Sequence, residues 1–224
     1  MINKHFSFTD FHYLSRKSLY ENIKVVASKF TGSVLDIGCG TRPYEHLFET
    51  DTYVGLEVTG DGRLTSFADA TYDGKTLPFP DDYFDNVLSF QVLEHVENIE
   101  DTLAEIFRVC KPGGNVLITM PFMWPEHEMP YDFRRLTSEG IKKQLLDAEF
   151  RIVHYEKSCS GNSALIALWL DYLSTSAMAR YKFFRLFIRA MLATPLNLFF
   201  TKFCASKNKS ELFLDHVLIC QPKK

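Results

Sequence analysis

The residue types best suited to chemistry lie in one short segment, Asp36-Ile37-Gly38-Cys39-Gly40. Glycines at positions 38 and 40 allow a sharp turn and let a ligand approach the main chain closely. The dinucleotide pattern G-x-G-x-x-G is not met, because position 43 is Pro. The carboxylate of Asp36 would repel a pyrophosphate, but it favours a ligand with an ammonium or sulfonium group. The segment therefore predicts a nucleotide-like cofactor of that kind, and S-adenosylmethionine carries both groups.

Strands and helices alternate along the chain around this segment. Apolar residues at spacings of three and four predict amphipathic helices over residues 15–30 and 99–109. Another helix, capped at residue 137 or 138, is expected to run through residue 148, and one after Gly40 is expected to carry Tyr44, Leu47 and Phe48. Short β-favouring runs predict seven strands, over residues 33–37, 52–57, 64–68, 84–90, 115–120, 150–157 and 212–220.

This alternation indicates an α/β fold, a doubly wound and mostly parallel sheet covered on both faces. The length of 224 residues suits one domain. We expect residues 1–157 and 211–224 to form its core. Residues 158–210 lack a strand pattern and are expected to form a helical insertion between strands six and seven.

Six motifs occur in the order in which one protein family has them. They are Asp36-x-Gly38-x-Gly40, Glu57, Asp69, Leu77–Asp81 with Phe84-Asp85-x-Val87, Gln91–Val96 and Glu105–Gly114. On these motifs the chain resembles the class I S-adenosylmethionine-dependent methyltransferases, in a branch similar to type 11. The resemblance runs from about Leu35 to Val153 and over the last strand, and it implies a Rossmann-like sheet and methyl transfer.

The resemblance also implies roles for single residues. Glu57 is expected to hold both ribose hydroxyls, and Asp69 to accept from the adenine amino group, with Phe67 and Ala70 beside the ring. The complete set of expected cofactor-binding residues is Asp36, Gly38, Cys39, Gly40, Glu57, Asp69, Ala70 and Gln91. The family's third glycine, at position 42, is replaced by Arg42. That arginine either pairs with the methionine carboxylate or points to solvent.

A second pattern, H-x-x-P-x-D-x-x-R-x-T over residues 127–137, resembles methyltransferases often associated with cell-surface glycan, lipopolysaccharide or lipid biosynthesis. Loops at the carboxyl ends of parallel strands line the crevice of such a sheet, so this segment is a candidate substrate loop. The candidate catalytic residues are His127, His95, Asp132 and Arg135.

Different roles are open for these residues. A histidine can remove a hydroxyl proton near neutral pH, but His127 can equally order its loop and His95 can pack over the cofactor. Asp132 and Arg135 can form a salt bridge within the loop. Arg134 either binds an anionic substrate or is solvated. No metal site is expected, since Glu126-His127-Glu128 has no second cluster to complete it.

The net charge of −3 hides an asymmetry. Residues 174–210 hold seven basic and no acidic residues, so this part carries +7 and the rest −10. A basic, aromatic-rich amphipathic helix is expected there, separated by Pro195 from a second apolar helix. Such a segment suits peripheral contact with an anionic membrane, packing on the acidic core, or a homodimer interface; no nucleic acid is expected as partner. The longest uncharged run has 13 residues, so no transmembrane helix is predicted.

Taken together, the sequence predicts an S-adenosylmethionine-dependent methyltransferase that methylates oxygen on a cell-surface glycan, lipid-linked or other small amphipathic acceptor. The alternative is a non-catalytic module that binds S-adenosylmethionine and acts on a membrane or protein partner through its basic insertion. Five scattered cysteines without a C-x-x-C pair favour a reducing, cytoplasmic location, with contact at the inner membrane face as an option.

Overall fold

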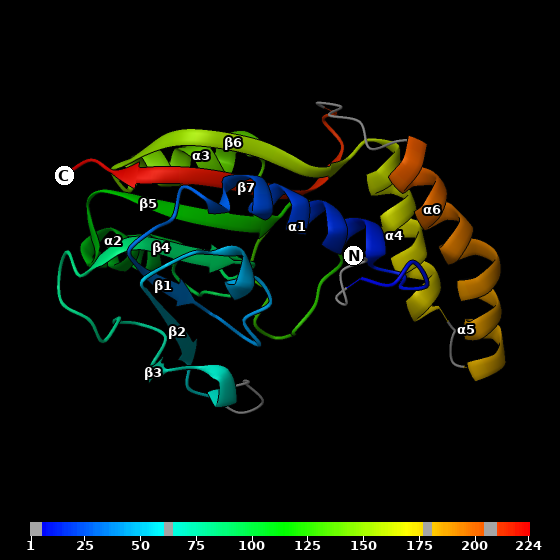
Figure 1. The fold of residues 1–224 in the computed structure, drawn as a ribbon, viewed down its shortest axis with the longest axis horizontal. Helices are drawn as coiled ribbons and strands as arrows, with labels where there is room; N and C mark the ends of the chain where they lie inside the picture. The colour runs from blue at the N-terminus through cyan, green and yellow to red at the C-terminus, as the bar shows by residue number, and fades with distance from the viewer. Residues whose placement is uncertain (1–5, 61–64, 177–180, 204–209) are drawn as a thin grey trace. The chain divides into compact units, whose positions relative to one another are not determined.

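Seven strands of the chain form one sheet, shown in the computed structural model in Figure 1. The structure describes residues 6–60, 65–176, 181–203 and 210–224. The order across the sheet is β3-β2-β1-β4-β5-β7-β6. The strands are β1 (Ser33–Ile37), β2 (Thr52–Val58), β3 (Ala70–Tyr72), β4 (Phe84–Phe90), β5 (Cys110–Pro121), β6 (Phe150–Ser160) and β7 (Phe213–Pro222). The predicted fold class, a mostly parallel doubly wound sheet with a helical insertion between strands six and seven, is confirmed.

The middle of the sheet is parallel. β1 pairs with β2 on one side and with β4 on the other, and β4 pairs with β5, all in the same direction. The chain therefore builds outward from β1 to β3 and then crosses over to continue on the other side of β1. Ligands of open α/β sheets bind outside the carboxyl ends of the strands at such a reversal. This edge carries the segment that follows Asp36.

The larger of two compact units comprises residues 22–156 and 216–224. Its central strands are buried on both faces, so their interiors are largely apolar, as in Val116, Leu117 and Ile118 of β5. Helix α2 (Ile99–Val109) is capped by Asn98, whose side chain accepts from the backbone N–H groups of Glu100 and Asp101. It buries Ile99, Leu103, Ile106 and Val109, one face at spacings of three and four. Helix α3 (Ser138–Asp147) is capped in the same way by Thr137.

Two predicted elements are wrong. After Gly40 the chain forms only the short 3-10 turn η1 (Glu45–Leu47), because Arg42 has a φ of 53° and Pro43 follows it. The strand expected over 64–68 is absent from its described part, where residues 65–67 form the turn η2 (Thr65–Phe67). The carboxylate of Asp69 accepts from the N–H of Gly55, so a side chain holds this segment against β2 until the ladder starts at Ala70.

The smaller unit comprises residues 157–215 together with the first 21 residues of the chain. Its helices are α4 (Asn162–Thr175), α5 (Lys182–Ile188), the π-helical turn η4 (Arg189–Ala193) and α6 (Thr194–Phe203), and helix α1 (Tyr13–Ala27) passes from this unit into the larger one. Phe11 packs in its apolar core with Leu170, Ile188 and Ala193. The amino-terminal segment thus belongs with the insertion, whereas the sequence grouped it with the sheet.

Pro195 does not separate two helices, contrary to the prediction. The helix continues from Lys182 to Phe203, and the wider turn η4 lies just before the proline. There the N–H of Thr194 bonds to the carbonyl of Arg189, five residues back. Pro195 then follows as the second residue of α6, so the wider turn lies directly before the residue that has no backbone N–H to donate.

Within the described residues, this continuous helix is the one long and apolar enough to cross a membrane by length and composition. The 21 residues Lys182–Lys202 reach a mean hydropathy of 1.4, and 17% of that window is buried. The prediction of no transmembrane helix rested on uncharged runs of at most 13 residues. Arg185 and Arg189 interrupt the uncharged run without interrupting the helix.

Candidate functional site

Five of the expected cofactor-binding residues meet around the turn after β1. The carboxylate of Glu57, at the end of β2, accepts from the N–H of Gly40 at 3.1 Å. The backbone N–H groups of Gly38 and Cys39 donate to the carbonyl of Leu56, at 2.8 and 3.1 Å. Asp36 lies at the end of β1, directly before the turn. Parallel pairing of β1 with β2 therefore brings together residues that are about 20 positions apart.

Asp36 is an acid in an environment that disfavours its charge. Its side chain is 1% exposed, and burial raises its pKa to about 7, against a hydrogen bond from the Tyr53 hydroxyl that lowers it. That hydroxyl donates to Oδ2 at 2.7 Å. The other oxygen, Oδ1, is buried and has no hydrogen-bond partner among the described residues. A buried acceptor of this kind calls for a donor, and the ammonium group of the expected cofactor is one.

Gly38 and Gly40 are needed for different reasons. Both have positive φ, +67° and +50°. A Cβ at Gly38 would lie 2.5 Å from Cγ2 of Val92, in the loop after β4, so only glycine fits there. At Gly40 a Cβ would meet none of the described atoms within 4 Å. The turn is packed against the loop after β4 on one side and is open to a ligand at Gly40.

Arg42 occupies the position of the family's third glycine, and its side chain is 16% exposed, so it does not extend freely into solvent. Its pairing with the methionine carboxylate stays a prediction. Its guanidinium donates to Oδ2 of Asp69 and lies 6.0 Å from the centre of the Tyr53 ring. Oδ2 of Asp69 also accepts from the N–H of Gly55 at 2.8 Å. The oxygen expected to bind adenine is thus engaged by two donors, and a base that bound there would use the other oxygen or displace Arg42.

The remaining cofactor candidates have plainer environments. Cys39 is buried, and burial raises the pKa of its thiol to about 11. Ala70 begins β3 beside Leu56. Gln91 follows β4 with a φ of 55°, and its amide donates to the hydroxyl of Thr119 at 3.2 Å. These residues shape the edge of the sheet, and their contact with a cofactor stays a prediction.

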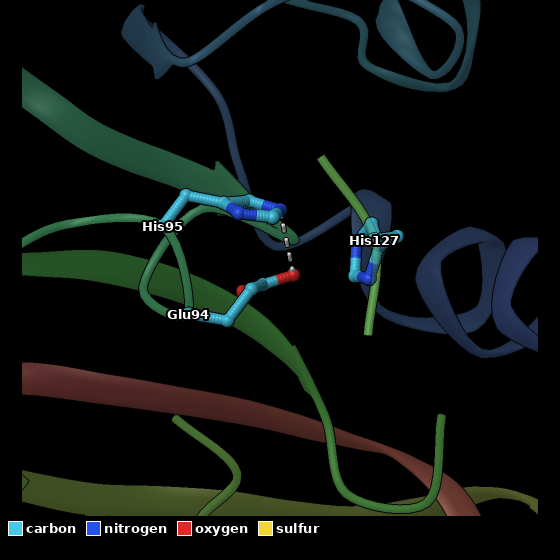
Figure 2. Close-up of side chains that lie close together, drawn as sticks. All are labelled: Glu94, His95 and His127. Atoms are coloured by element: carbon cyan, nitrogen blue, oxygen red, sulfur yellow. Dashed lines mark ion pairs between the residues drawn. The ribbon is translucent and has the colours of Figure 1, made fainter. Parts of the chain in front are cut away.

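The two candidate bases, His95 and His127, lie side by side. Their ring centres are 4.8 Å apart and the rings are nearly perpendicular. Figure 2 shows both close to Glu94, whose Oε1 is 3.8 Å from Nε2 of His95. Burial lowers the pKa of His95 below its usual value, so this ring is neutral at neutral pH. The sequence placed Glu94 in the motif Gln91–Val96 but did not single it out as a site residue. Its position directly before His95 in the sequence was the signal that could have identified it.

Asp132 and Arg135 form the salt bridge that the sequence left open. Asp132 has a 1% exposed side chain and accepts from Nη2 of Arg135 at 2.7 Å and from the backbone N–H of His127 at 2.9 Å. The hydrogen bond from Arg135 is the main reason that the pKa of Asp132 falls to about 2. The pair holds the loop around His127, and a direct catalytic role for either residue stays a prediction.

Arg134 does not extend freely into solvent, because main-chain carbonyls bind its guanidinium, and its binding of an anionic substrate stays a prediction. Its guanidinium donates to the carbonyls of Leu93, Val96 and Glu97. The backbone N–H of Phe133 donates to the carbonyl of Glu94 at 2.9 Å. These bonds, which we call the loop clamp, fasten the loop after β5 onto the loop after β4. The clamp brings His127 next to His95.

Comparison with known proteins finds methyltransferases. Residues 35–118 match a family model described as a methyltransferase domain. The ubiquinone/menaquinone biosynthesis C-methyltransferases of Burkholderia mallei and Burkholderia thailandensis are each 32% identical over 117 residues. The match covers 45% of this chain and 48% of each relative. The chain thus spans about half the length of these curated relatives.

Solved methyltransferase structures share the fold. A putative methyltransferase from Bacillus halodurans has a TM-score of 0.58 at 17% identity, covering 92% of this chain and all of that one. Phosphoethanolamine N-methyltransferase 2 from Haemonchus contortus, in complex with S-adenosyl-L-methionine, has a TM-score of 0.55 at 16% identity, covering 99% of this chain and 61% of that one. Identities this low establish similarity of fold.

Removing the loop clamp should loosen the substrate loop. In Arg134→Ala, three carbonyls lose their guanidinium donor, and we expect the free energy of unfolding to fall by about 1 to 3 kcal/mol. Limited proteolysis should then cut within residues 122–137 faster than in the parent. Urea unfolding measures the first effect. Lys143→Ala, which removes an exposed cation on α3, is the matched control, and equal protease resistance of the two variants would contradict the clamp.

Binding of S-adenosylmethionine should strengthen with pH because of Asp36. With a pKa near 7, the carboxyl is neutral below that value and cannot pair with an ammonium group. We expect affinity to rise up to about tenfold between pH 6 and pH 8, measured by calorimetry. Asp36→Asn should bind weakly, without this dependence. Tyr53→Phe loses a hydrogen bond that lowers the pKa, so its transition should move to higher pH; an unmoved transition would assign the effect to another group.

Proposed function

We propose that this chain, whose residues 35–118 form a class I S-adenosylmethionine-dependent methyltransferase domain of the type-11 kind, is a methyltransferase. We propose further that it methylates an oxygen atom of a small amphipathic acceptor. A cell-surface glycan or a lipid-linked molecule is the acceptor class we favour. One observation carries the proposal. A buried acid, an open glycine turn and two adjacent imidazoles lie at the same edge of the sheet.

The residues of the turn fit the cofactor. Bound there, S-adenosylmethionine supplies a methyl group carried on a positively charged sulfur. Oδ1 of Asp36 provides the missing partner for its ammonium group, and the open space at Gly40 admits it to the main chain. Both oxygens of Glu57 already accept one backbone N–H each. A carboxylate oxygen has two acceptor sites, so Glu57 can still accept ribose hydroxyls.

An oxygen nucleophile needs a group that takes its proton. His127 is the better placed imidazole, because its side chain is 33% exposed whereas that of His95 is 9% exposed. The buried Asp132 accepts from the backbone N–H of His127 and so holds the main chain that carries the ring. General base catalysis by a positioned imidazole contributes about 10² to 10⁴ in rate.

The relatives leave the methylated atom open. The Burkholderia proteins are named as C-methyltransferases and the Haemonchus protein as an N-methyltransferase. For this chain, the pattern of residues 127–137 supports an oxygen acceptor, and its exposed Met129, Tyr131 and Phe133 offer apolar contact to an amphipathic one. The side chains of these residues are 63, 52 and 43% exposed.

Methyl transfer should produce S-adenosylhomocysteine when the protein is mixed with S-adenosylmethionine and an extract of cell-envelope lipids and glycans. His127→Ala should lower the rate by about 100-fold or more while cofactor binding is kept. His154→Ala, on β6, is the matched control and should leave the rate unchanged.

The product and the controls decide between the hypotheses. A methyl group on oxygen, located by NMR of the product, is expected; one on carbon or nitrogen would contradict the acceptor class. If the protein binds S-adenosylmethionine but forms no S-adenosylhomocysteine with any extract, the non-catalytic module is the better description.

The long helix of the smaller unit, Lys182–Phe203, supports a membrane surface as the place where the protein meets its acceptor. Between Tyr181 and Phe199 it exposes large apolar side chains, namely Tyr181, Phe183, Phe184, Leu186, Phe187, Met191, Leu198 and Phe199. Lys182 and Arg185 are exposed among them, and Arg189 is half-buried over the Phe11 ring. Of the seven basic residues between positions 174 and 210, Arg180, Lys207 and Lys209 lie outside the described residues.

A helix that lies along a membrane suits this pattern better than one that spans it. Ile188, Ala193 and Asn197 are buried on one side of the helix, and the Asn197 amide donates to the carbonyls of Phe8 and Asp10. A spanning helix would have to leave these partners. We propose that the exposed side lies in the interface of an anionic membrane, at its inner face, where an amphipathic acceptor resides.

Sedimentation with vesicles should reveal this contact. The protein should pellet with vesicles that contain anionic lipid, and far less with neutral ones. Phe183→Ser with Phe187→Ser, and separately Lys182→Glu with Arg185→Glu, should each lower the bound fraction several-fold. Lys143→Glu is the matched charge control. Unchanged pelleting of both double variants would refute the contact, and a dimer detected by light scattering would point to association between copies.

A further inference from the structure

Glu94, His95 and His127 form a cluster of ligand-type side chains that methyl transfer alone does not require. Each offers one oxygen or nitrogen atom, and these atoms all lie within 4.8 Å of one another. Figure 2 shows the three side chains close together, Glu94 and His95 from the loop after β4 and His127 from the loop after β5. We propose that this Glu-His-His cluster binds one divalent transition-metal ion.

The hydrogen bond of His95 identifies the nitrogen that is available. Nδ1 lies 2.7 Å from the carbonyl oxygen of Tyr131. A carbonyl oxygen only accepts, so Nδ1 carries the proton, and in the neutral ring Nε2 has a lone pair. That lone pair lies 3.8 Å from Oε1 of Glu94. Two atoms with lone pairs at this separation are close enough to bind one cation between them after a small approach.

His127 has a similar environment at its Nδ1. The carbonyl of Pro125 lies 3.2 Å away and Oδ2 of Asp132 3.3 Å away, and both are acceptors. Nη2 of Arg135 lies 3.3 Å from the same nitrogen, but it also donates to Asp132 at 2.7 Å. The proton therefore belongs on Nδ1, which leaves Nε2 of His127 as the ligand atom. Metal-bound histidines commonly donate their other N–H to a carbonyl or carboxylate in this way.

The carboxylate of Glu94 is fully buried, with 0% of its side chain exposed. Burying an ionised carboxylate is unfavourable unless positive charge compensates it. Arg134 and Arg135 act on Glu94 through their charge. The hydrogen bonds described for their guanidinium groups, however, go to main-chain carbonyls and to Asp132. A metal ion at the cluster would add direct compensation.

The ligand set indicates the class of metal. Two imidazoles and one carboxylate, with open positions left over, suit Zn²⁺ and similar transition metals better than Mg²⁺, which prefers oxygen alone. Tetrahedral ligands about 2 Å from a metal lie about 3.3 Å from one another, so ligand atoms that lie up to 4.8 Å apart would approach by at most about 1.5 Å. The sequence predicted no metal because Glu126-His127-Glu128 lacked a second group. The loop clamp supplies that second group, because it brings Glu94 and His95 next to His127.

The position of the cluster suggests its use. Val92, which packs against the glycine turn, is two residues before Glu94. A metal held by these residues would lie on the loop that packs against the glycine turn, and it would supply a coordination position to an oxygen of the acceptor. A metal that holds the acceptor oxygen would do so in place of proton removal by His127. This role rests on the proposed function, but the metal site itself does not.

Metal binding can be measured without turnover. Untagged protein is freed of metal with a chelator and titrated with Co²⁺, then with Zn²⁺ and Mg²⁺, by absorption and calorimetry. We expect one Co²⁺ per chain with a visible absorption band, displacement by Zn²⁺, and much weaker Mg²⁺ binding. His127→Gln and Glu94→Gln should each weaken Co²⁺ binding by more than about tenfold, and Asp132→Asn by about tenfold.

Controls keep the outcome decisive. His154→Gln should bind Co²⁺ as the parent does. If Glu94→Gln fails to fold, His127→Gln still tests the site, because its side chain lies partly in solvent. The proposal is overturned if folded parent protein binds neither Co²⁺ nor Zn²⁺ below millimolar concentration, or if His127→Gln binds Co²⁺ unchanged. S-adenosylmethionine binding, measured on the metal-free protein, tests the proposed function separately.

Discussion

The candidate site depends on the parallel placement of β1 between β2 and β4. Because these strands run in the same direction, their carboxyl ends share an edge, and the segments that follow them meet there. Asp36, Glu57 and the loop that begins at Gln91 come together for this reason. Gly38 makes the approach close enough, since Val92 occupies the space that a Cβ would need.

A second level of organisation joins two loops rather than two strands. Arg134 satisfies three carbonyls of the loop after β4, and Phe133 satisfies a fourth. Loops leave many main-chain groups without ladder partners, and a guanidinium with five donors can bind several of them. Asp132 and Arg135 do the same within the loop after β5. Hydrogen bonds from neighbouring side chains thus position the two loops that carry His95 and His127.

The sequence predicted the elements that flank the site with good accuracy. These include the strands Ser33–Ile37 and Phe84–Phe90 and the helix Ile99–Val109. These elements are long apolar runs or clear helical periods, so burial decides them. The predictions for the helix after Gly40 and for the third strand were wrong. In both places a single polar or backbone feature, the φ of Arg42 and the carboxylate of Asp69, outweighs the local pattern. Helical continuity through Pro195 depends in the same way on one widened turn.

The sequence by itself determined the sheet and the cofactor segment, because alternating apolar patterns and the order Asp36, Gly38, Gly40 are local properties of the chain. Which polar groups meet was decided by the tertiary structure. Arg42 faces Asp69, Arg134 binds the loop after β4, and Glu94 and His127 lie together across 33 positions of sequence. Hydrogen bonds and coordination act over about 3 Å. Spacing along the chain therefore cannot predict them until the fold has set the distance between segments.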